Sequence, residues 1–377
     1  MRVGVVTWDG GSNVQPFEVL CRGMLDRGFE VHVLSHEAHR RLYEAAGATF
    51  ARLPVGDKAP GERPSASGEL ERVTGVWLSP EIAEAVVAML LSARLDIAIV
   101  DVSLMTAFAA CEATATPFIA LHHTLPGATW AGPRRERFEA FVDPVNDVRR
   151  ALGLAVLAGF GDLMATAAAH LVPTAATLDT PVPWELPLHY VGPLQPAGGD
   201  GELPDLPARF VLVSLSTTWQ RQIDHLQQAI DALAPLDRAV VVTTGPSVEP
   251  SEVTAAANTV VTAELPHRRI LHRVDAVVTH AGHGTVISAL TAGVPIVCMP
   301  MGRDQHDITR RVLAVGAGVE IDPNSVRHEL LAAVRQVIGE QRFADGAAAM
   351  ARSIAGHGGV NEALAIIDRC VHEHRPR

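Results

Sequence analysis

The sequence predicts an α/β protein of two domains, each with a parallel β-sheet covered by helices. Short runs of β-branched residues alternate with segments whose apolar residues recur at helical spacing, which is the pattern of βαβ units. The alternation stops at the Pro- and Gly-rich stretch Gly192–Pro207 and then starts again. The 377 residues also exceed the roughly 150 residues of one typical domain. We therefore expect a first domain over residues 1–191, a linker over 192–208 and a second domain over 209–377.

The first half contains short apolar runs rich in β-branched residues, as buried parallel strands are. These runs are Arg2–Thr7, Glu30–Ser35, Ile97–Asp101 and Phe118–Leu121. Between them, Pro16–Arg27 carries apolar residues at helical spacing, and Ser79 and Pro80 are the N-cap and first residue of another helix. Residues 55–67 are polar and rich in Pro and Gly, so they form either a plain connection or a loop that shapes a binding site.

The second half repeats the alternation of strands and helices. The expected strands are Phe210–Ser214, Ala239–Thr243, Thr259–Val261, Ala276–Thr279, Ile296–Met299 and Val319–Ile321. Both halves thus have the same type of architecture.

Composition excludes several classes of function. The residues are 48% hydrophobic and 19% charged, as in a globular enzyme, and the net charge of -11 argues against a nucleic-acid or anionic-membrane partner. The 4 cysteines lack metal-binding spacing, so we expect no zinc and no disulfides. The first apolar run is too short for a signal peptide, and no apolar run approaches the roughly 20 residues of a membrane span. A cytoplasmic protein is the resulting expectation.

The segment Thr279–Thr285 (THAGHGT) lies between an apolar strand and an apolar helix. Its small residues let the backbone approach a ligand, and the N–H groups and dipole of a helix N-terminus favour an anion. His280 and His283 can donate hydrogen bonds to phosphate oxygens, and Thr285 adds a hydroxyl. A second small polar turn, Ser214–Thr218 (SLSTT), follows another strand, and the carboxyl ends of parallel strands share one edge of the sheet. The sequence therefore predicts a diphosphate site at this edge.

From His280 the chain continues HAGHGTVISALTAGVPIVCMPMGRDQHDITRRV, and this string resembles the signature of the nucleotide-sugar-dependent glycosyltransferases that decorate antibiotics and plant metabolites (family 1). The spacing from His280 to Asp304 and Gln305 matches over more than 20 residues. The resemblance extends to Val211–Thr217, to Leu265–His267 and, more loosely, to the whole chain. It implies the GT-B fold, with two Rossmann-like domains and their parallel sheets facing across a cleft. It also implies that the last helix, near residues 362–369, crosses back to the first domain.

The resemblance assigns roles to residues of the second half. The residues expected to contact the diphosphate are His280, Gly282, His283, Gly284, Thr285 and, from the other turn, Ser216 and Thr217. The backbone around Leu265 would recognise a pyrimidine base. Asp304 and Gln305 would hold sugar hydroxyls, because their oxygens and amide match vicinal diols.

The resemblance further implies an inverting enzyme that moves a sugar, including a deoxysugar, from a dTDP-sugar or UDP-sugar to a small natural-product acceptor on the N-terminal half. No cofactor is expected beyond this donor substrate. No DxD pair ends an early strand of the second half, so we expect metal-independent transfer. We expect no nucleic-acid or membrane partner, and the oligomeric state stays open, with a homodimer among the options.

One position departs from the family. Relatives carry a catalytic histidine, or an aspartate in glycopeptide-modifying members, three residues before the proline that opens the first helix, and here that position is Asn13. An amide cannot act as a general base near neutral pH, although it can accept a hydrogen bond from an acceptor and orient it. Three explanations stay open: another residue takes the proton, the acceptor is acidic enough to need little help, or the chain is a catalytically silent helper that only binds the donor.

Residues of two strand ends are the candidates for that proton. Asp101 matches a position where relatives carry an aspartate that supports the histidine, and a helix N-cap is its alternative role. His122 and His123 follow the next strand, and only one of them can line the site because consecutive strand residues face opposite ways. We therefore take Asn13, Asp101 and His122 as the catalytic candidates. A nucleotide-sugar epimerase of the same fold is a rival that would use the same donor turn.

Overall fold

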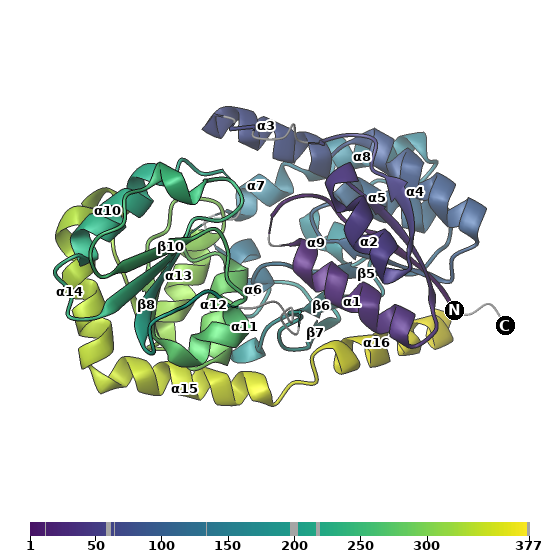
Figure 1. Ribbon diagram of the computed structural model, residues 1–377. Helices are drawn as coiled ribbons and strands as arrows, with labels where there is room; N and C mark the ends of the chain where they lie inside the picture. Colours follow the sequence, from purple (N-terminus) through teal and green to yellow (C-terminus); the bar gives the residue numbers. More distant parts are fainter. Residues whose placement is uncertain are drawn as a thin grey trace. The chain divides into compact units, whose positions relative to one another are not determined.

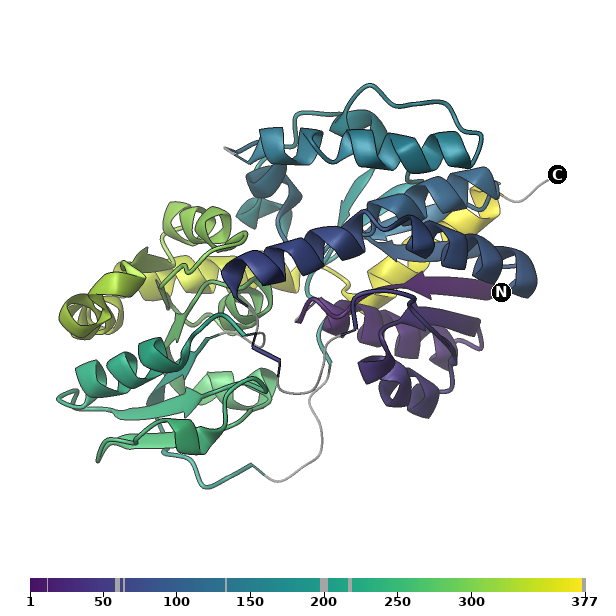
Figure 2. The ribbon, with the colours of Figure 1, turned by 90° about the horizontal axis from the view of Figure 1, so that it is seen from above.

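The structure, a computed structural model, describes residues 1–11, 13–57, 62–63, 65–132, 134–196, 203–215 and 219–374. The chain divides into two compact units. Unit 1 comprises Met1–Pro173, Thr180–Gln195 and His357–Arg377, and unit 2 comprises Thr174–Asp179 and Pro196–Gly356. Figures 1 and 2 show that each unit has its own sheet with its own covering helices.

Unit 1 has a seven-stranded sheet in the order β3-β2-β1-β4-β5-β6-β7. All pairs are parallel, and the first six strands follow the 3-2-1-4-5-6 order of a doubly wound nucleotide-binding sheet. The strands are β1 (Arg2–Val6), β2 (Glu30–Ser35), β3 (Thr49–Arg52), β4 (Ile97–Asp101), β5 (Phe118–Leu121), β6 (Ala169–Val172) and β7 (Leu188–Tyr190).

Helices cover both faces of this sheet. They are α1 (Val14–Asp26), α2 (Arg40–Ala46), α3 (Ala66–Trp77), α4 (Pro80–Ala93), α5 (Met105–Ala113), α6 (Pro126–Trp130), α7 (Arg135–Glu139), α8 (Val142–Ala151), α9 (Phe160–Met164) and α16 (Val360–His374). The last of these, α16, packs against α1, and a Cβ at Gly23 of α1 would lie 2.9 Å from Val360 and 3.0 Å from Leu364 (Figure 1). Unit 1 is therefore completed by a helix that follows unit 2 in the chain.

The core of unit 1 lies on both faces of the sheet. Along β4, Ile97 and Ile99 join the apolar cluster that contains α1 and α16, whereas Ala98 and Val100 join the cluster that contains α4 and α5. A strand that is buried on both faces is apolar at nearly every position, and in β4 the exception is Asp101 at its carboxyl end. This explains why β4 reads as a continuous apolar run rather than as an alternating one.

Unit 2 has a six-stranded parallel sheet in the order β10-β9-β8-β11-β12-β13. Its strands are β8 (Phe210–Ser214), β9 (Ala239–Thr243), β10 (Thr259–Thr262), β11 (Val274–Thr279), β12 (Ile296–Cys298) and β13 (Gly318–Glu320). Its helices are α10 (Ile223–Leu233), α11 (His267–Ile270), α12 (His283–Thr291), α13 (Gln305–Ala314), α14 (Val326–Gly339) and α15 (Gln341–Ala355). Helices α10 and α14 pack on each other over one face, where they enclose an apolar core with β8, β9 and β11 (Figure 1).

Short 3₁₀ helices connect some of these elements. They are η1 (Glu37–His39), η2 (Ala176–Leu178), η3 (Pro250–Glu252), η4 (Leu271–Arg273) and η5 (Pro323–Ser325). The predicted fold class, two α/β units with parallel sheets, is confirmed by this architecture.

One stretch of the described chain, Ser67–Ala93, has the length and hydropathy of a membrane span. It consists of α3 and α4, which are separate helices because Ser79 caps the second one and Pro80 opens it. Ile82 and Val86 of α4 are fully buried in the core of unit 1. The apolar character of α4 is thus that of a core helix.

Candidate active site

The first candidate region is the edge of the unit 2 sheet where β8 and β11 end. These strands are parallel neighbours with Val213 opposite Val278, so the turns that follow them lie at the same edge. Ser214 Oγ lies 3.4 Å from His267 Nε2, which ties the start of α11 to the end of β8. Ser216 and Thr217, expected to contact phosphate from this turn, lie outside the described residues.

The turn between β11 and α12 has the geometry of an anion site. Gly282 is the N-cap of α12 and has no side chain to cap the first N–H groups of the helix. Ala281 has a φ of 64°, a left-handed conformation that costs a residue with a Cβ about 1 kcal/mol or more. Strain of this kind persists where the surrounding structure enforces it, and functional turns are its common location. His283 is the first residue of α12, and Gly284 and Thr285 are partly exposed in the same turn.

His280 is held tightly beside this turn. Its side chain is buried, with Nδ1 3.5 Å from Thr279 Oγ1, and a Cβ at Gly282 would lie only 2.6 Å from its Nε2. Burial, with a smaller contribution from the positive charge of Arg303, lowers the pKa of His280 to about 4, and the negative charge of Asp304 opposes this shift. His280 is therefore neutral near pH 7 and offers a hydrogen bond rather than a charge.

Arg303 is a residue of this edge that the sequence analysis missed. Its positive charge helps to lower the pKa of His280. Its side chain is exposed, and its backbone has a φ of 55°. The left-handed conformation places it at a sharp turn before α13. It stands inside the string that resembles the family signature, directly before Asp304, and this adjacency was the available signal.

Asp304 and Gln305 differ in their surroundings. Gln305 is 1% exposed; its Oε1 accepts hydrogen bonds from the N–H groups of Met301 at 2.7 Å and Gly302 at 2.9 Å. Its Nε2 donates to Gln220 Oε1 at 2.9 Å. Gln305 therefore shapes the loop before α13, whereas Asp304, the partly exposed N-cap residue of that helix, is the better placed of the two for a sugar hydroxyl. Leu265, the residue expected beside the base, is buried two residues before α11.

The second candidate region is in unit 1, where the side-chain amide of Asn13 makes three hydrogen bonds. Its Nδ2 donates to Trp8 O at 3.0 Å and to Asp101 Oδ2 at 2.9 Å, and its Oδ1 accepts from Gly10 N at 3.0 Å. The side chain is 3% exposed. Asn13 is thus a buried bridge between the loop after β1 and the end of β4.

Asp101 is the residue that Asn13 contacts. It is fully buried; Oδ1 accepts from Ser103 N at 2.9 Å, and Oδ2 lies 3.4 Å from His123 Nδ1 in addition to Asn13. Burial alone would raise the pKa of Asp101, but the His123 charge and the hydrogen bonds from Asn13 and Ser103 outweigh it and hold the pKa below its ordinary value. Asp101 is therefore a carboxylate. It is not the N-cap of α5, which is Leu104.

The structure separates the two consecutive histidines. His122 is fully buried, with Nε2 3.0 Å from His170 Nδ1 and its ring 5.1 Å from that of Trp130. His123 points the other way, and its side chain is 23% exposed beside Asp101. The arrangement therefore brings together Asn13, Asp101 and His123, and it places His122 in a separate buried cluster.

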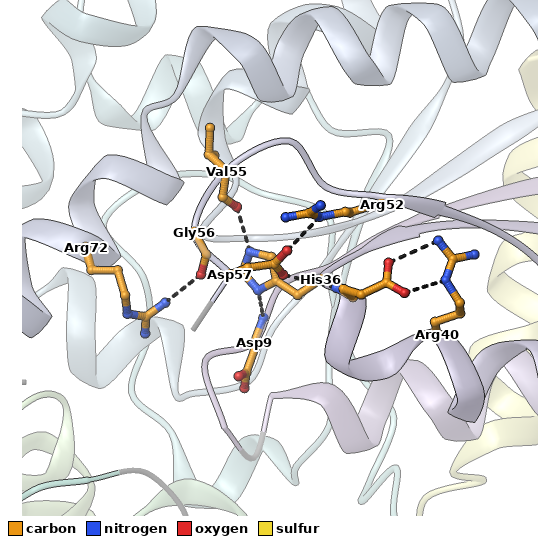
Figure 3. Close-up of polar contacts among 9 residues, drawn as sticks. Asp9, His36, Arg40, Arg52, Val55, Gly56, Asp57 and Arg72 are labelled. Atoms are coloured by element: carbon orange, nitrogen blue, oxygen red, sulfur yellow. Dashed lines mark hydrogen bonds and ion pairs between the residues drawn. The ribbon is translucent and has the colours of Figure 1, made fainter. Parts of the chain in front are cut away.

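The loop that carries Asn13 is anchored by His36 at the end of β2 (Figure 3). Asp9 N donates to His36 Nδ1 at 2.8 Å, and His36 Nε2 lies 2.8 Å from Val55 O. Since Nδ1 accepts, Nε2 must carry the proton, and burial lowers the pKa of His36 so that this neutral form persists. Asp57 accepts from Glu37 N at 3.1 Å and from Arg52 at 2.7 Å, which fixes the same segment to η1 and β3.

Among the described residues, no group of three or more His, Cys, Asp or Glu side chains is arranged to hold a metal ion.

Comparison with known proteins decides the family. The model of the family "UDP-glucoronosyl and UDP-glucosyl transferase" matches residues 154–355, more than half of the chain. The chain belongs to this family. The predicted resemblance to natural-product glycosyltransferases is thereby confirmed, and the protein is a glycosyltransferase.

Two relatives match this glycosyltransferase over nearly its whole length. The 4'-demethylrebeccamycin synthase of Lentzea aerocolonigenes is 27% identical, covering 98% of this chain and 99% of the relative. The O-mycaminosyltylonolide 6-deoxyallosyltransferase of Streptomyces fradiae is 24% identical, covering 98% of this chain and 97% of the relative.

Solved structures of glycosyltransferases share the fold. The calicheamicin glycosyltransferase CalG4 has a TM-score of 0.83 at 19% identity and covers 100% of this chain and 99% of its own. The glycosyltransferase VinC, solved in complex with dTDP, has a TM-score of 0.74 at 20% identity, with 99% and 100% coverage. At these identities the likeness establishes the GT-B fold alone.

Proposed function

We propose that this glycosyltransferase moves a sugar from a pyrimidine nucleoside diphosphate to a small natural-product acceptor, with inversion at the anomeric carbon and without a metal ion. The observation that carries the proposal is the edge of unit 2 where the uncapped N-terminus of α12, the buried His280 and the charge of Arg303 lie together. The named antibiotic-pathway relatives and the dTDP complex of VinC support a dTDP-sugar or UDP-sugar as donor.

In the proposed reaction an acceptor atom attacks the anomeric carbon in line with the leaving group. The bond from the acceptor to this carbon forms as the bond from the carbon to the diphosphate oxygen breaks, and the acceptor loses its proton to a base. The diphosphate leaves with its charge stabilised by the N–H groups at the start of α12, by a hydrogen bond from His280 and by the Arg303 guanidinium. These groups supply the stabilisation that a metal ion would otherwise provide.

Unit 2 holds the donor in this proposal. Thr285 and the backbone around Gly282 and Gly284 contact the diphosphate, the backbone near Leu265 contacts the base, and Asp304 contacts the sugar. Gln305 stabilises the loop before Asp304 by accepting a hydrogen bond from Met301 N. Unit 1 receives the acceptor. A cytoplasmic location of the enzyme is also part of the proposal.

Calorimetric titration with UDP, dTDP and ADP, each with and without EDTA, tests the donor site. We expect one pyrimidine diphosphate to bind equally well in EDTA and His280→Ala to weaken its binding about tenfold to 100-fold, because a hydrogen bond to a charged group contributes about 1.5–3 kcal/mol. His328→Ala, at an exposed histidine of α14, is the matched control and should bind as the wild type does. Absence of binding by all three nucleotides at millimolar concentration would overturn the proposal.

A further inference from the structure

We propose that His123 is the general base of this glycosyltransferase, and that Asp101 and Asn13 are its positioning residues. The inference rests on the proposed function and names the group that takes the acceptor's proton. His123, just after β5, and Asn13, in the loop after β1, both meet Oδ2 of the buried Asp101 carboxylate.

His123 lies beside the buried carboxylate of Asp101. Nδ1 of His123 lies 3.4 Å from Oδ2 of a fully buried carboxylate. This contact is longer than an ordinary hydrogen bond and short enough for strong attraction between the carboxylate and an imidazolium. A base oriented by a third group is the general arrangement of activated sites.

The three side chains differ in their access to solvent. Asn13 and Asp101 are both buried, and His123 is the member of the group whose side chain reaches solvent. A general base must come within hydrogen-bond distance of the acceptor, so of these three side chains His123 alone can meet a substrate. His122 is fully buried against His170 and Trp130.

Both N–H groups of the Asn13 side chain are used in hydrogen bonds. One N–H of Nδ2 bonds to Trp8 O and the other to Asp101 Oδ2, while Oδ1 is occupied by Gly10 N. An amide at this position donates to the carboxylate at every pH and never competes for a proton. Asn13 therefore keeps Asp101 ionised and fixes Oδ2 where His123 Nδ1 meets it.

The proton transfer needs no protein group other than His123 and Asp101. As the acceptor O–H oxygen attacks the anomeric carbon, its proton passes to Nε2 of a neutral His123 whose Nδ1–H faces Asp101. The resulting imidazolium pairs with the Asp101 carboxylate, and the proton is then released to solvent. No oxidant, reductant or further reactant is needed.

The pairing can be tested without an acceptor, by NMR titration of the histidine side chains. The His123 signals are assigned as those that disappear in His123→Gln. We expect Asp101→Asn to lower the pKa of His123 by about one unit, since a carboxylate partner stabilises the charged ring. Circular dichroism and diphosphate binding verify that the variant is folded. An unchanged His123 pKa in folded Asp101→Asn would overturn the pairing.

Kinetics test the role in transfer, with dTDP-glucose and UDP-glucose as donors and water, phenol and 4-nitrophenol as acceptors. We expect His123→Gln to reduce the rate with phenol or water about 100-fold or more, to affect the acidic 4-nitrophenol less, and to remove the acidic limb of the pH profile. His372→Gln, at an exposed histidine of α16, is the control.

The two proposals fail in different ways. If the wild type binds no pyrimidine diphosphate, the proposed function fails. If the wild type binds diphosphate and hydrolyses or transfers sugar, and His123→Gln does so at the same rate with the same pH profile, the proposed function stands and His123 is not the base.

Discussion

Two glycines leave room for side chains of the candidate sites. A Cβ at Gly282 would lie 2.6 Å from His280 Nε2, and a Cβ at Gly10 would lie 2.9 Å from Asn13 Oδ1. Real Cβ atoms do not approach other atoms this closely, so either substitution must move the neighbouring side chain. Both glycines thus serve the site by leaving room rather than by their conformational freedom.

We predict that Gly282→Ala weakens binding of the diphosphate about tenfold, which is about 1.4 kcal/mol, because the new methyl displaces the His280 ring. Titration calorimetry with the preferred nucleotide measures the effect. Gly339→Ala, at an exposed glycine with nothing within 4 Å of its added Cβ, is the matched control. Equal affinity in wild type and Gly282→Ala would show that the His280 position does not matter for the diphosphate.

Asn13→Asp should produce a pH-dependent loss of stability. Asn13 Nδ2 lies 2.9 Å from Asp101 Oδ2, and two carboxyls that close cannot both ionise, so the pKa of one of them is raised. The folded state then holds an extra proton above about pH 4, and stability falls as pH rises. We expect a deficit of about 2 kcal/mol at pH 8 that narrows towards pH 5.

Urea unfolding of Asn13→Asp and wild type at the two pH values measures this deficit. Asn361→Asp, at an exposed asparagine of α16, should show no such trend. A deficit that is the same at both pH values would mean that Asn13 does not bridge to an ionised Asp101.

At the level of elements, burial explains which strands the sequence predicted. β4, β5, β8 and β11 are central, and their apolar runs were visible because both faces are covered. The edge strand β3 was missed because TFAR is half polar and mostly exposed, and β7 was missed because it has 3 residues. The interior strand β6 (Ala169–Val172) was also missed although it is buried throughout, because it has 4 residues and His170 interrupts its apolar run. Short edge strands carry little periodic signal and depend on neighbours that are distant in the chain.

The same reasoning separates the two sites. The donor turn was predictable because strand, turn and helix are contiguous in sequence from Val274 to Thr291. The contacts of Asp101 with Asn13 and His123 could not be predicted from the spacing of residues, since they join residues that are far apart in the chain. The sequence indicated that only one of His122 and His123 could line a site and took His122, whereas the fold buries His122 against His170 and places His123 beside Asp101. The contact of Gln305 with Gln220 could not be recognised either, because the two residues are 85 positions apart in the chain.

At the level of the whole molecule, buried neutral histidines couple stability to pH. Burial lowers the pKa of His36, and it lowers the pKa of His170 and of His280 to about 4. In the unfolded chain these groups titrate near their ordinary pKa of about 6.5. Between about pH 6.5 and 4 the unfolded state therefore binds more protons, so stability falls as the pH is lowered.

We predict that the urea concentration at the midpoint of unfolding is lower at pH 5 than at pH 7.5. The depressed pKa of Asp101 acts in the same direction at still lower pH. His36→Gln should make the change between the two pH values smaller, whereas His328→Gln, at an exposed position, should leave it as in the wild type. A stability that rises on acidification would contradict the assignment of neutral buried histidines.

The return of α16 to unit 1 has a consequence for biosynthesis. Apolar residues of α16, among them Leu364, Ile367 and Val371, complete the core beside α1, yet they leave the ribosome only after all of unit 2. During translation the nascent first unit exposes that part of its core until unit 2 has emerged. Unit 1 therefore reaches its final packing last, although its first strand is made first.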